Sequence, residues 1–330
     1  NSSYILKNGS TATEFGFNLL MVIFKSLKIS YPIFKAIISL TGLLLIFSTA
    51  KRYIKNINLF MLLFLLYPYL INIITLRNFI VMSIFIFTSR YLIEHKKGNK
   101  IKYFILILLA SFIHVSALFF LLFLFTNLFK NKTFQYTYFL FIAVLTMFFI
   151  IFKDNIGEFL GELLFKITGR ERLKAYFISQ VNKGFLLPWL IQLVWTFNLA
   201  RVHRAYRLST FYKKDMSDLI GFVYHASLIL LLLFPIYLYN LQFDRIFYNV
   251  LPLIYISFIK FVENSKSEEN KEKISFESSN VKKMNRALSS GHTEKTILLI
   301  AFSIMLFIIN IAITMYDSVI VSIVNNNYFI

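Results

Sequence analysis

The sequence has no cysteine, few acidic residues and few of the residues that interrupt helices: 16 Asp and Glu, 5 Pro and 10 Gly among 330 residues. Without cysteine, disulfide scaffolds and thiolate metal sites are excluded. Charged residues make up only 15% of the chain and hydrophobic residues 58%, whereas soluble proteins are about a quarter charged and half apolar. The shortage of charge excludes an ordinary soluble enzyme and a disordered chain, and it indicates that a lipid bilayer surrounds most of the protein.

The basic residues lie mainly in short gaps between apolar runs. The chain has 35 Lys and Arg residues and a formal net charge of +19. In a soluble protein this excess would suggest a nucleic-acid partner. Here the positions of the basic residues are those that the positive-inside rule predicts for cytoplasmic loops. We therefore expect a multi-pass membrane protein whose partner is the lipid bilayer, with no nucleic-acid partner.

Six apolar runs have the length of one membrane-spanning helix, which needs roughly 20 residues. They lie at about 31–50, 134–152, 184–200, 219–240, 244–262 and 296–316. A further apolar stretch, from Leu59 to Ile93, is too long for a single span and is interrupted at Arg77. It predicts two short helices of roughly 25 Å each, joined at Arg77.

The run from Tyr103 to Phe125 either crosses the membrane once or enters and returns. Only a return puts most loop Lys and Arg residues on the inner side, with 21 in inner loops and 10 in outer segments; one crossing would leave 13 inside and 18 outside. The inner loops are then 51–58, 94–102, 127–133, 201–216 and 264–295. We therefore predict a broken, re-entrant segment with Ser111 to His114 near its tip. Non-helical backbone at that depth needs protein or a water-filled cavity around it, so a polar cavity is implied.

Two polar stretches complete the predicted architecture. Residues 153–183 alternate charge with hydrophobicity, which is typical of amphipathic helices lying over the outer face. Residues 264–295 are rich in Lys, Glu, Ser and Asn, which suits a flexible cytoplasmic loop. We expect one integral membrane domain, 1–330, all-α and polytopic, with about eight to ten membrane segments. Because residue 1 is Asn and no charged leader precedes a short apolar core, we expect the sequence to begin part-way into a longer chain.

Ionisable residues within apolar runs are the first candidates for function, because each is costly there. Arg77 is either a snorkelling side chain at a helix end or an anion clamp for phosphate, for which its guanidinium fork is suited. His114 is either a hydrogen-bonded packing residue or a group for proton transfer near neutral pH. No second His, Asp or Glu lies at ligand spacing, so the sequence predicts no metal site.

The remaining candidates lie in the predicted outer segments. Arg170 and Arg172, with Tyr176, form either a solvated charged face or a site for phosphate or sugar. Asp244 and Arg245 open a predicted span, with Tyr248 one turn later. The Asp favours the helix dipole and the Arg opposes it, which hints at an anionic ligand. Glu14 precedes an amphipathic stretch and is either a first-turn acid or a functional carboxylate.

Part of the sequence resembles the EpsG family of multi-spanning bacterial proteins from exopolysaccharide and capsule clusters, which are likened to Wzy-type polymerases. The specific block spans 76–118: Leu76-Arg77-Asn78, a basic break after Glu94, and Phe112-x-His114-x-Ser116-Ala117. The family often has Gln where Asn78 stands, and both carry an amide. Looser matches are Glu14-Phe15-Gly16-Phe17, Arg172 to Tyr176, and Arg245 to Tyr248. The further N-terminal helices usual in the family are not in this sequence.

The resemblance implies an enzyme of the bacterial cytoplasmic membrane, a polysaccharide polymerase that works at the outer face. It would transfer the glycan from one polyprenyl diphosphate to a sugar on another. Such a reaction needs a group that accepts the proton of the attacking hydroxyl, and cations for the departing diphosphate, a role that Arg fills without metal or cofactor. His114 and Glu14 are then the candidate bases. The candidates for binding diphosphate or sugar are Arg77, Asn78, Arg170, Arg172, Tyr176, Arg245 and Tyr248.

Two other functions stay open at this point. A flippase that moves lipid-linked sugar also needs Arg in a central cavity, although we find no internal repeat of the kind that transporters show. A non-catalytic scaffold of an export system would use Arg77 and His114 only for packing. As protein partners, a polymerase implies a flippase and a chain-length regulator of the same pathway.

Overall fold

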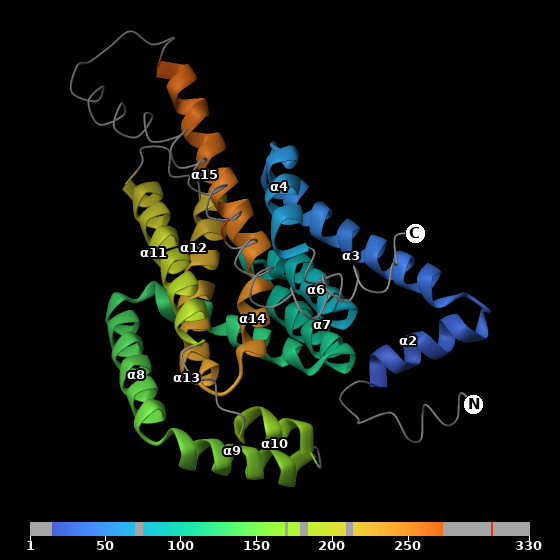
Figure 1. Ribbon diagram of the computed structural model, residues 1–330. Coiled ribbons are helices and arrows are strands. Elements are labelled where there is room, and N and C mark those ends of the chain that lie inside the picture. The colour runs from blue at the N-terminus through green and yellow to red at the C-terminus, as the bar shows by residue number, and fades with distance from the viewer. Residues whose placement is uncertain are drawn as a thin grey trace.

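The computed structural model describes residues 15–69, 75–168, 171–178, 184–208 and 214–272, together with residue 305. Within these residues all regular structure is helical (Figure 1). Five helical segments there are long and apolar enough to cross a membrane: Tyr31–Tyr53, Leu76–Ile93, Lys132–Ile151, Asp218–Tyr237 and Leu241–Asn264. The prediction of an all-α, multi-pass membrane protein is confirmed.

The N-terminal part contains helices α2 (Phe15–Ser26), α3 (Tyr31–Tyr53), α4 (Ile57–Phe64), η2 (Leu65–Tyr69) and α6 (Leu76–Ile93). Helix α4 begins where the Asn56 side chain accepts a hydrogen bond from the Leu59 backbone N–H at 3.1 Å. The predicted pair of short helices between 59 and 93 is present. The first is already broken at Tyr67 and Pro68, whose backbones are not helical, and the second begins at Leu76. Proline accounts for this earlier break, since it cannot continue a helical hydrogen-bond ladder.

The segment from Tyr103 to Phe125 is a hairpin rather than one continuous span. Helix α7 (Asn99–Ile113) ends at His114, and the 3₁₀ helix η3 (Val115–Lys130) begins directly after it. The chain reverses between them, and the two arms are joined by a hydrogen bond of 2.7 Å from the Tyr103 hydroxyl to the Phe120 carbonyl oxygen. The predicted break at His114 is confirmed, and the return of this segment to the same side of the membrane stays a prediction.

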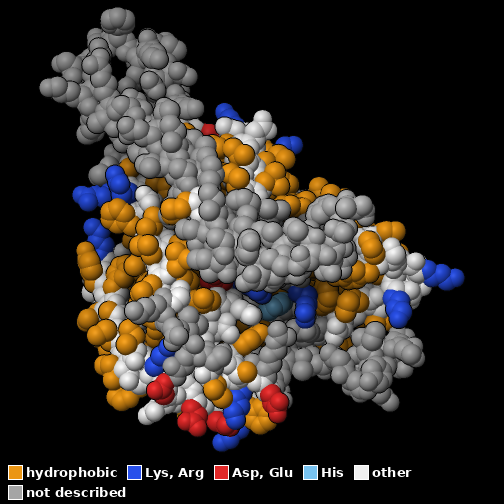
Figure 2. All heavy atoms as spheres, viewed as in Figure 1, with side chains coloured by type: hydrophobic (Ala, Val, Ile, Leu, Met, Phe, Trp, Pro, Cys, Tyr) orange, Lys and Arg blue, Asp and Glu red, His pale blue; other side chains and the backbone are white. Residues whose placement is uncertain are grey.

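Two helices beyond this hairpin cover the predicted amphipathic stretch. Helix α8 (Lys132–Ile151) is a peripheral span, and its exposed side chains, such as Leu140 (67%) and Val144 (61%), suit contact with lipid. Helices α9 (Lys153–Thr168) and α10 (Glu171–Ile178) follow it and pack on each other at the bottom of Figure 1. Figure 2 shows acidic side chains gathered at this lower edge, beneath a body that is largely hydrophobic.

The remaining helices include the two most buried candidate spans, Asp218–Tyr237 and Leu241–Asn264. They are α11 (Leu186–Leu208), α12 (Lys214–Ile229), η4 (Leu230–Leu233), α13 (Phe234–Tyr237), η5 (Leu241–Phe243), α14 (Asp244–Tyr248) and α15 (Leu251–Glu272). Helix α11 continues past the predicted end at residue 200. Helix α15 continues to Glu272, so the first part of the loop predicted at 264–295 is helical instead. The predicted span at 296–316 lies outside the described residues, apart from Met305.

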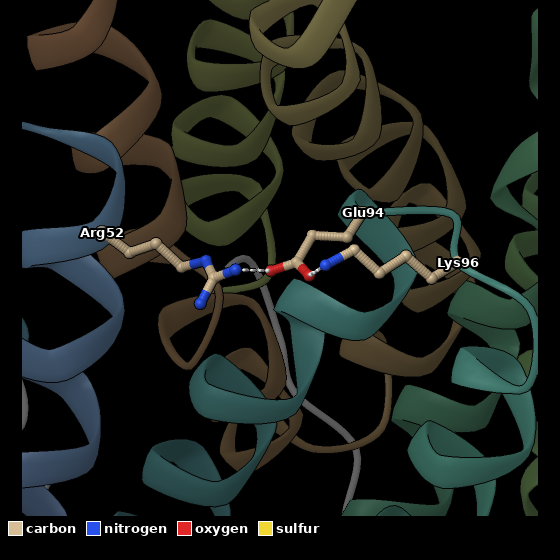
Figure 3. A network of polar contacts seen from close by, with 3 residues as sticks. All are labelled: Arg52, Glu94 and Lys96. Atoms are coloured by element: carbon tan, nitrogen blue, oxygen red, sulfur yellow. Dashed lines mark ion pairs between the residues drawn. The ribbon is translucent and has the colours of Figure 1, made fainter.

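Several basic loops meet at one end of the bundle, which we call the basic end. There the Arg52 guanidinium lies 2.8 Å from the Glu94 carboxylate, which also pairs with Lys96 at 3.5 Å (Figure 3). The backbone N–H groups of Lys55 and Asn56 donate to the Glu263 carboxylate at 2.8 and 2.6 Å. These contacts bring the loops 51–58 and 94–102 together with the α15 segment around Glu263. The geometry therefore agrees with the charge count that put 103–125 in a hairpin.

Candidate functional site

Three helices run from the basic end to the opposite end of the bundle, which we call the distal end. Helix α6 has Glu94 at its basic end and Arg77 in its first turn. Since α6 has 18 residues, Arg77 lies about 27 Å from the basic end. Helix α7 likewise begins beside the basic loop and ends at His114, and α15 leads from α14 toward Glu263. The fold therefore places Arg77, His114 and Asp244 at the same end.

A reciprocal amide pair joins α6 to the turn between α14 and α15. Asn78 Nδ2 donates to Asn249 Oδ1 at 3.0 Å, and Asn249 Nδ2 donates to Asn78 Oδ1 at 2.9 Å. Asn78 is 4% exposed and Asn249 is fully buried, so water does not compete for these bonds. The pair fixes Arg77, one residue before Asn78, relative to Tyr248, one residue before Asn249. Asn78 thus holds the site together, and direct contact of its amide with substrate stays a prediction.

The start of α14 carries a carboxylate surrounded by tyrosines. Tyr248 lies one helical turn after Asp244 in α14, so the two side chains share a face of that helix. The rings of Tyr67 and Tyr248 meet edge to face, with centroids 5.1 Å apart. Tyr67 and Tyr248 are 1% and 7% exposed, while Asp244 and Arg245 are half-buried. The start of α14 thus places a carboxyl group and a guanidinium group near two buried tyrosines at the distal end.

Helix α2 joins this end through two contacts. The guanidinium carbon of Arg77 lies 5.6 Å from the centre of the Phe17 ring, a cation–π distance. One residue earlier, Gly16 lies so close to the Phe112 backbone that a Cβ there would stand 2.9 Å from the Phe112 carbonyl carbon. Glycine is therefore required at this crossing. Arg77 itself is exposed at the surface of the site.

His114 forms the turn of the re-entrant hairpin. Its backbone is extended, with φ −153° and ψ 130°. Its ring Nδ1 accepts from the Ser116 backbone N–H at 3.2 Å, and its carbonyl oxygen accepts from the Ala117 N–H at 3.1 Å. The Phe-x-His-x-Ser-Ala pattern is therefore, in part, the sequence of a turn: His114 ends one helix and caps the next. A role in proton transfer stays a prediction.

Of the other predicted site residues, only Tyr176 lies with its side chain among the described residues. Tyr176 is half-buried and packs against the cluster of Phe177, Leu238 and Tyr239, which adjoins the segment leading to Asp244. Arg172 belongs to α10, and the description does not extend to its side chain. Arg170 and Glu14 lie outside the described residues. Their predicted roles in binding and catalysis stay predictions.

Charges on α9 and α10 are largely engaged with one another or with solvent. The Lys174 ammonium pairs with the Glu162 carboxylate, and this hydrogen bond lowers the pKa of Glu162 and raises that of Lys174. Asp154, Glu158 and Glu171 are exposed. Among the described residues no three His, Asp or Glu side chains lie together as metal ligands would. Asp244 differs from these three exposed carboxylates in being half-buried, next to the buried Tyr248 of its own helix.

Sequence reasoning did not find three of the residues that build this site. Asp244 was interpreted only as a helix-start acid, and Tyr67 and Asn249 were not considered. A signal for Asp244 was present, because an Asp with a Tyr four residues later in an apolar run is an intramembrane ionisable group with a partner on the same helix face. Neither Tyr67 nor Asn249 carried such a signal, since each acts through a residue far away in the chain.

The fold and this site define a multi-pass membrane protein with cationic and carboxylate side chains gathered at the end away from its basic loops. The family model described as the EpsG family matches residues 1–276, and the chain belongs to that family. This confirms the resemblance seen in the sequence and indicates a role in polysaccharide biosynthesis. No curated protein and no solved structure matches the chain.

Proposed function

We propose that the protein polymerises lipid-linked oligosaccharide repeats into a surface polysaccharide. This proposal rests on one observation: the Asn78–Asn249 amide pair holds Arg77 next to the Asp244–Tyr248 segment at the distal end. Membership of the EpsG family supports the pathway, and the side chains gathered at this end suit the reaction.

The reaction transfers the glycan of one polyprenyl diphosphate to a sugar hydroxyl on another. As the anomeric carbon–oxygen bond breaks, negative charge grows on the departing diphosphate. Guanidinium groups bind such oxyanions through paired, charge-assisted hydrogen bonds, and fixed cations stabilise the transition state more than the ground state. Arg77 and Arg245 are the described cations placed for this role, one exposed and one half-buried. Arg170 and Arg172 are further predicted contributors.

The proposal places this site at the outer face of a bacterial cytoplasmic membrane. The positive-inside rule assigns the basic end to the cytoplasm, because its short loops carry the excess of Lys and Arg. The distal end is then the outer one, where completed lipid-linked repeats are joined. The exposed hydrophobic side chains along α8 are consistent with lipid on the flank of the bundle.

The test is to replace Arg77 with Ala in cells that depend on this protein for their surface polysaccharide. Arg90→Ala is a matched control, because Arg90 lies on the same helix at the basic end, with its guanidinium carbon 3.5 Å from the centre of the Phe87 ring. Polysaccharide length is read on a gel, beside a membrane blot and an assay of lipid-linked repeats. We expect Arg77→Ala to leave single repeats at the outer face and Arg90→Ala to make polymer of normal length.

Three outcomes would count against the proposal. Normal polymer from Arg77→Ala, at normal protein level, would make Arg77 a packing residue. Accumulation of single repeats at the inner face would favour a flippase. An equal defect in Arg77→Ala and Arg90→Ala would show a general loss of structure rather than the loss of a diphosphate contact.

A further inference from the structure

We propose that the groove between α9 and α10 binds a pyranose ring of the growing glycan, on the water side of the distal end. This inference rests on the proposed function and deepens it, because it assigns a place to the sugar part of the substrate. The diphosphate is left to Arg77 and Arg245. None of the residues that line the groove was a candidate site residue in the sequence analysis.

The groove has the size and the lining of a small-ligand site. Its volume is about 460 Å³. Ligand pockets have volumes of roughly 300–1,000 Å³, with mainly apolar walls and a few polar groups that fix the ligand. The described residues that line this groove are Phe165, Glu171, Lys174, Ala175 and Ile178.

Close contact between α9 and α10 builds one wall of the groove. Gly157, Gly161 and Phe165 are spaced four residues apart and therefore lie along one face of α9. A Cβ at Gly157 would stand 2.6 Å from the Phe177 carbonyl oxygen, and one at Gly161 would stand 3.2 Å from the Lys174 carbonyl oxygen. One turn later the same face carries the Phe165 ring, which lines the groove. The glycines thus fix α10 against α9 beside this ring.

The groove faces away from the bundle. Phe177 is 8% exposed and packs in a cluster with Tyr239, so this side of α10 faces the body of the protein. Ala175 lies two residues earlier, about 200° around the helix, and it is exposed. The Tyr239 hydroxyl also donates to the Lys153 carbonyl oxygen at 3.1 Å, which ties the start of α9 to the distal end.

This orientation favours the glycan as the occupant over the lipid chain. The proposed topology assigns the outer side of α9 and α10 to the water outside the membrane. The sugars of a lipid-linked repeat lie in that water, whereas its polyprenyl chain stays in the bilayer. Figure 2 agrees, because charged side chains gather at this lower edge.

The lining suits a sugar ring rather than a diphosphate. The Phe165 ring offers an apolar face on which the C–H groups of a pyranose can pack. The Glu171 carboxylate is exposed and can accept hydrogen bonds from sugar hydroxyls. The Lys174 ammonium lies 5.7 Å from the centre of the Phe165 ring and is paired with Glu162. Among these described groups two carboxylates outnumber one ammonium, and this charge disfavours an anion.

A sugar site away from the reacting bond holds the polymer on the protein between transfers. A chain bound there keeps its end at a high effective concentration near Arg77 and Arg245. Loss of the site should therefore shorten the polymer, while single joining steps still occur.

The test measures the binding of oligosaccharide fragments to the full-length protein in micelles. The fragments come from partial hydrolysis of the cells' own surface polysaccharide, so they carry neither diphosphate nor lipid. Ala175→Trp fills the groove from an exposed position, and Phe165→Leu keeps an apolar side chain but removes the ring. Phe159→Trp is the matched control, because Phe159 is exposed on α9 and does not line the groove.

We expect Ala175→Trp to raise the Kd of the fragments at least about tenfold, since the indole occupies the space of the sugar. Phe165→Leu should raise the Kd about two- to tenfold, which is the contribution of one stacked aromatic contact. Phe159→Trp should bind as the wild type does. No binding by the wild type, or equal binding by Ala175→Trp and Phe159→Trp, would overturn the proposal. Unchanged binding by Phe165→Leu would overturn the packing of the sugar on this ring.

Polymer length in cells separates this inference from the proposed function. Ala175→Trp should make shorter polymer than Phe159→Trp at equal protein level, whereas Arg77→Ala should leave single repeats. If Ala175→Trp makes polymer of normal length and Arg77→Ala leaves single repeats, only this inference fails. If Arg77→Ala also makes normal polymer, the proposed function fails as well.

Discussion

The Asn78–Asn249 pair gives the sharpest quantitative prediction, because two hydrogen bonds join the two parts of the site. We consider Asn78→Ala, Asn249→Ala and the double variant. Each single substitution removes both bonds and leaves the partner's amide buried without them. The double variant removes both amides together, so no polar group of this pair is left behind.

The expected coupling energy follows from the burial of the two amides. Hydrogen bonds between helices in membrane proteins are worth about 0.6 kcal/mol on average and up to about 1.7 kcal/mol. Two such bonds, together with the cost of an unpaired buried amide, give a coupling energy of roughly 1–3 kcal/mol. The double variant should therefore lose less free energy of unfolding than the two single variants together, by that amount. The cycle also cancels the other contacts that each side chain makes.

The assay is unfolding of the purified variants in mixed micelles, by titration with a denaturing detergent. Asn198→Ala is the matched control, since Asn198 donates only to the Val194 carbonyl one turn away in α11, at 2.9 Å. Combined with Asn78→Ala it should be additive within about 0.5 kcal/mol. Additivity of Asn78→Ala and Asn249→Ala within the same margin would refute the argument that this pair joins α6 to the start of α15.

Three further predictions concern other contacts. Gly42→Val should cost about 1–3 kcal/mol in the same micelle titration, because a Cβ at Gly42 would stand 2.5 Å from Phe79 Cε1 and 2.7 Å from Ser83 Oγ; an unchanged free energy of unfolding would contradict the close packing of α3 on α6. His114→Asn should be more stable than His114→Ala by about 0.5–2 kcal/mol, because an Asn oxygen can accept the Ser116 N–H in place of Nδ1; equal stabilities would exclude the capping role. The pairing with Lys174 lowers the pKa of Glu162, so it stabilises the α9–α10 contact above the ordinary carboxyl pKa and is lost as pH falls through the lowered pKa. Acid should therefore speed proteolysis of this region in the wild type but not in Glu162→Gln. Identical pH profiles of the two proteins would refute the pairing.

The helices and the hairpin were predictable because their signals are local. A run of apolar residues shows its own length, and the Lys and Arg residues mark the ends that share a side of the membrane. That charge count alone separated one crossing of 103–125 from a hairpin, and the break at His114 agrees. The earlier break in the 59–93 stretch also had a local signal, Pro68, which the sequence reasoning passed over in favour of Arg77.

The contacts that assemble the site were not predictable in the same way. Asn78 and Asn249 lie 171 residues apart, and nothing in either neighbourhood specifies the other. Tyr67 reaches Tyr248 across a comparable separation. Single residues such as Arg77 and Arg245 were found because a charge in an apolar run is costly and therefore conspicuous. Which of them meet, and which side chain orients which, is decided by tertiary packing.

Purified protein in lipid vesicles, supplied with lipid-linked repeats, tests the central claim most directly. The measurement follows polyprenyl diphosphate released and glycosidic bonds formed over time, with Arg77→Ala in parallel vesicles. The account predicts one lipid diphosphate released for each repeat joined, and neither product from Arg77→Ala. Movement of repeats across the bilayer without any joining, or joining that Arg77→Ala performs as fast as wild type, would contradict it.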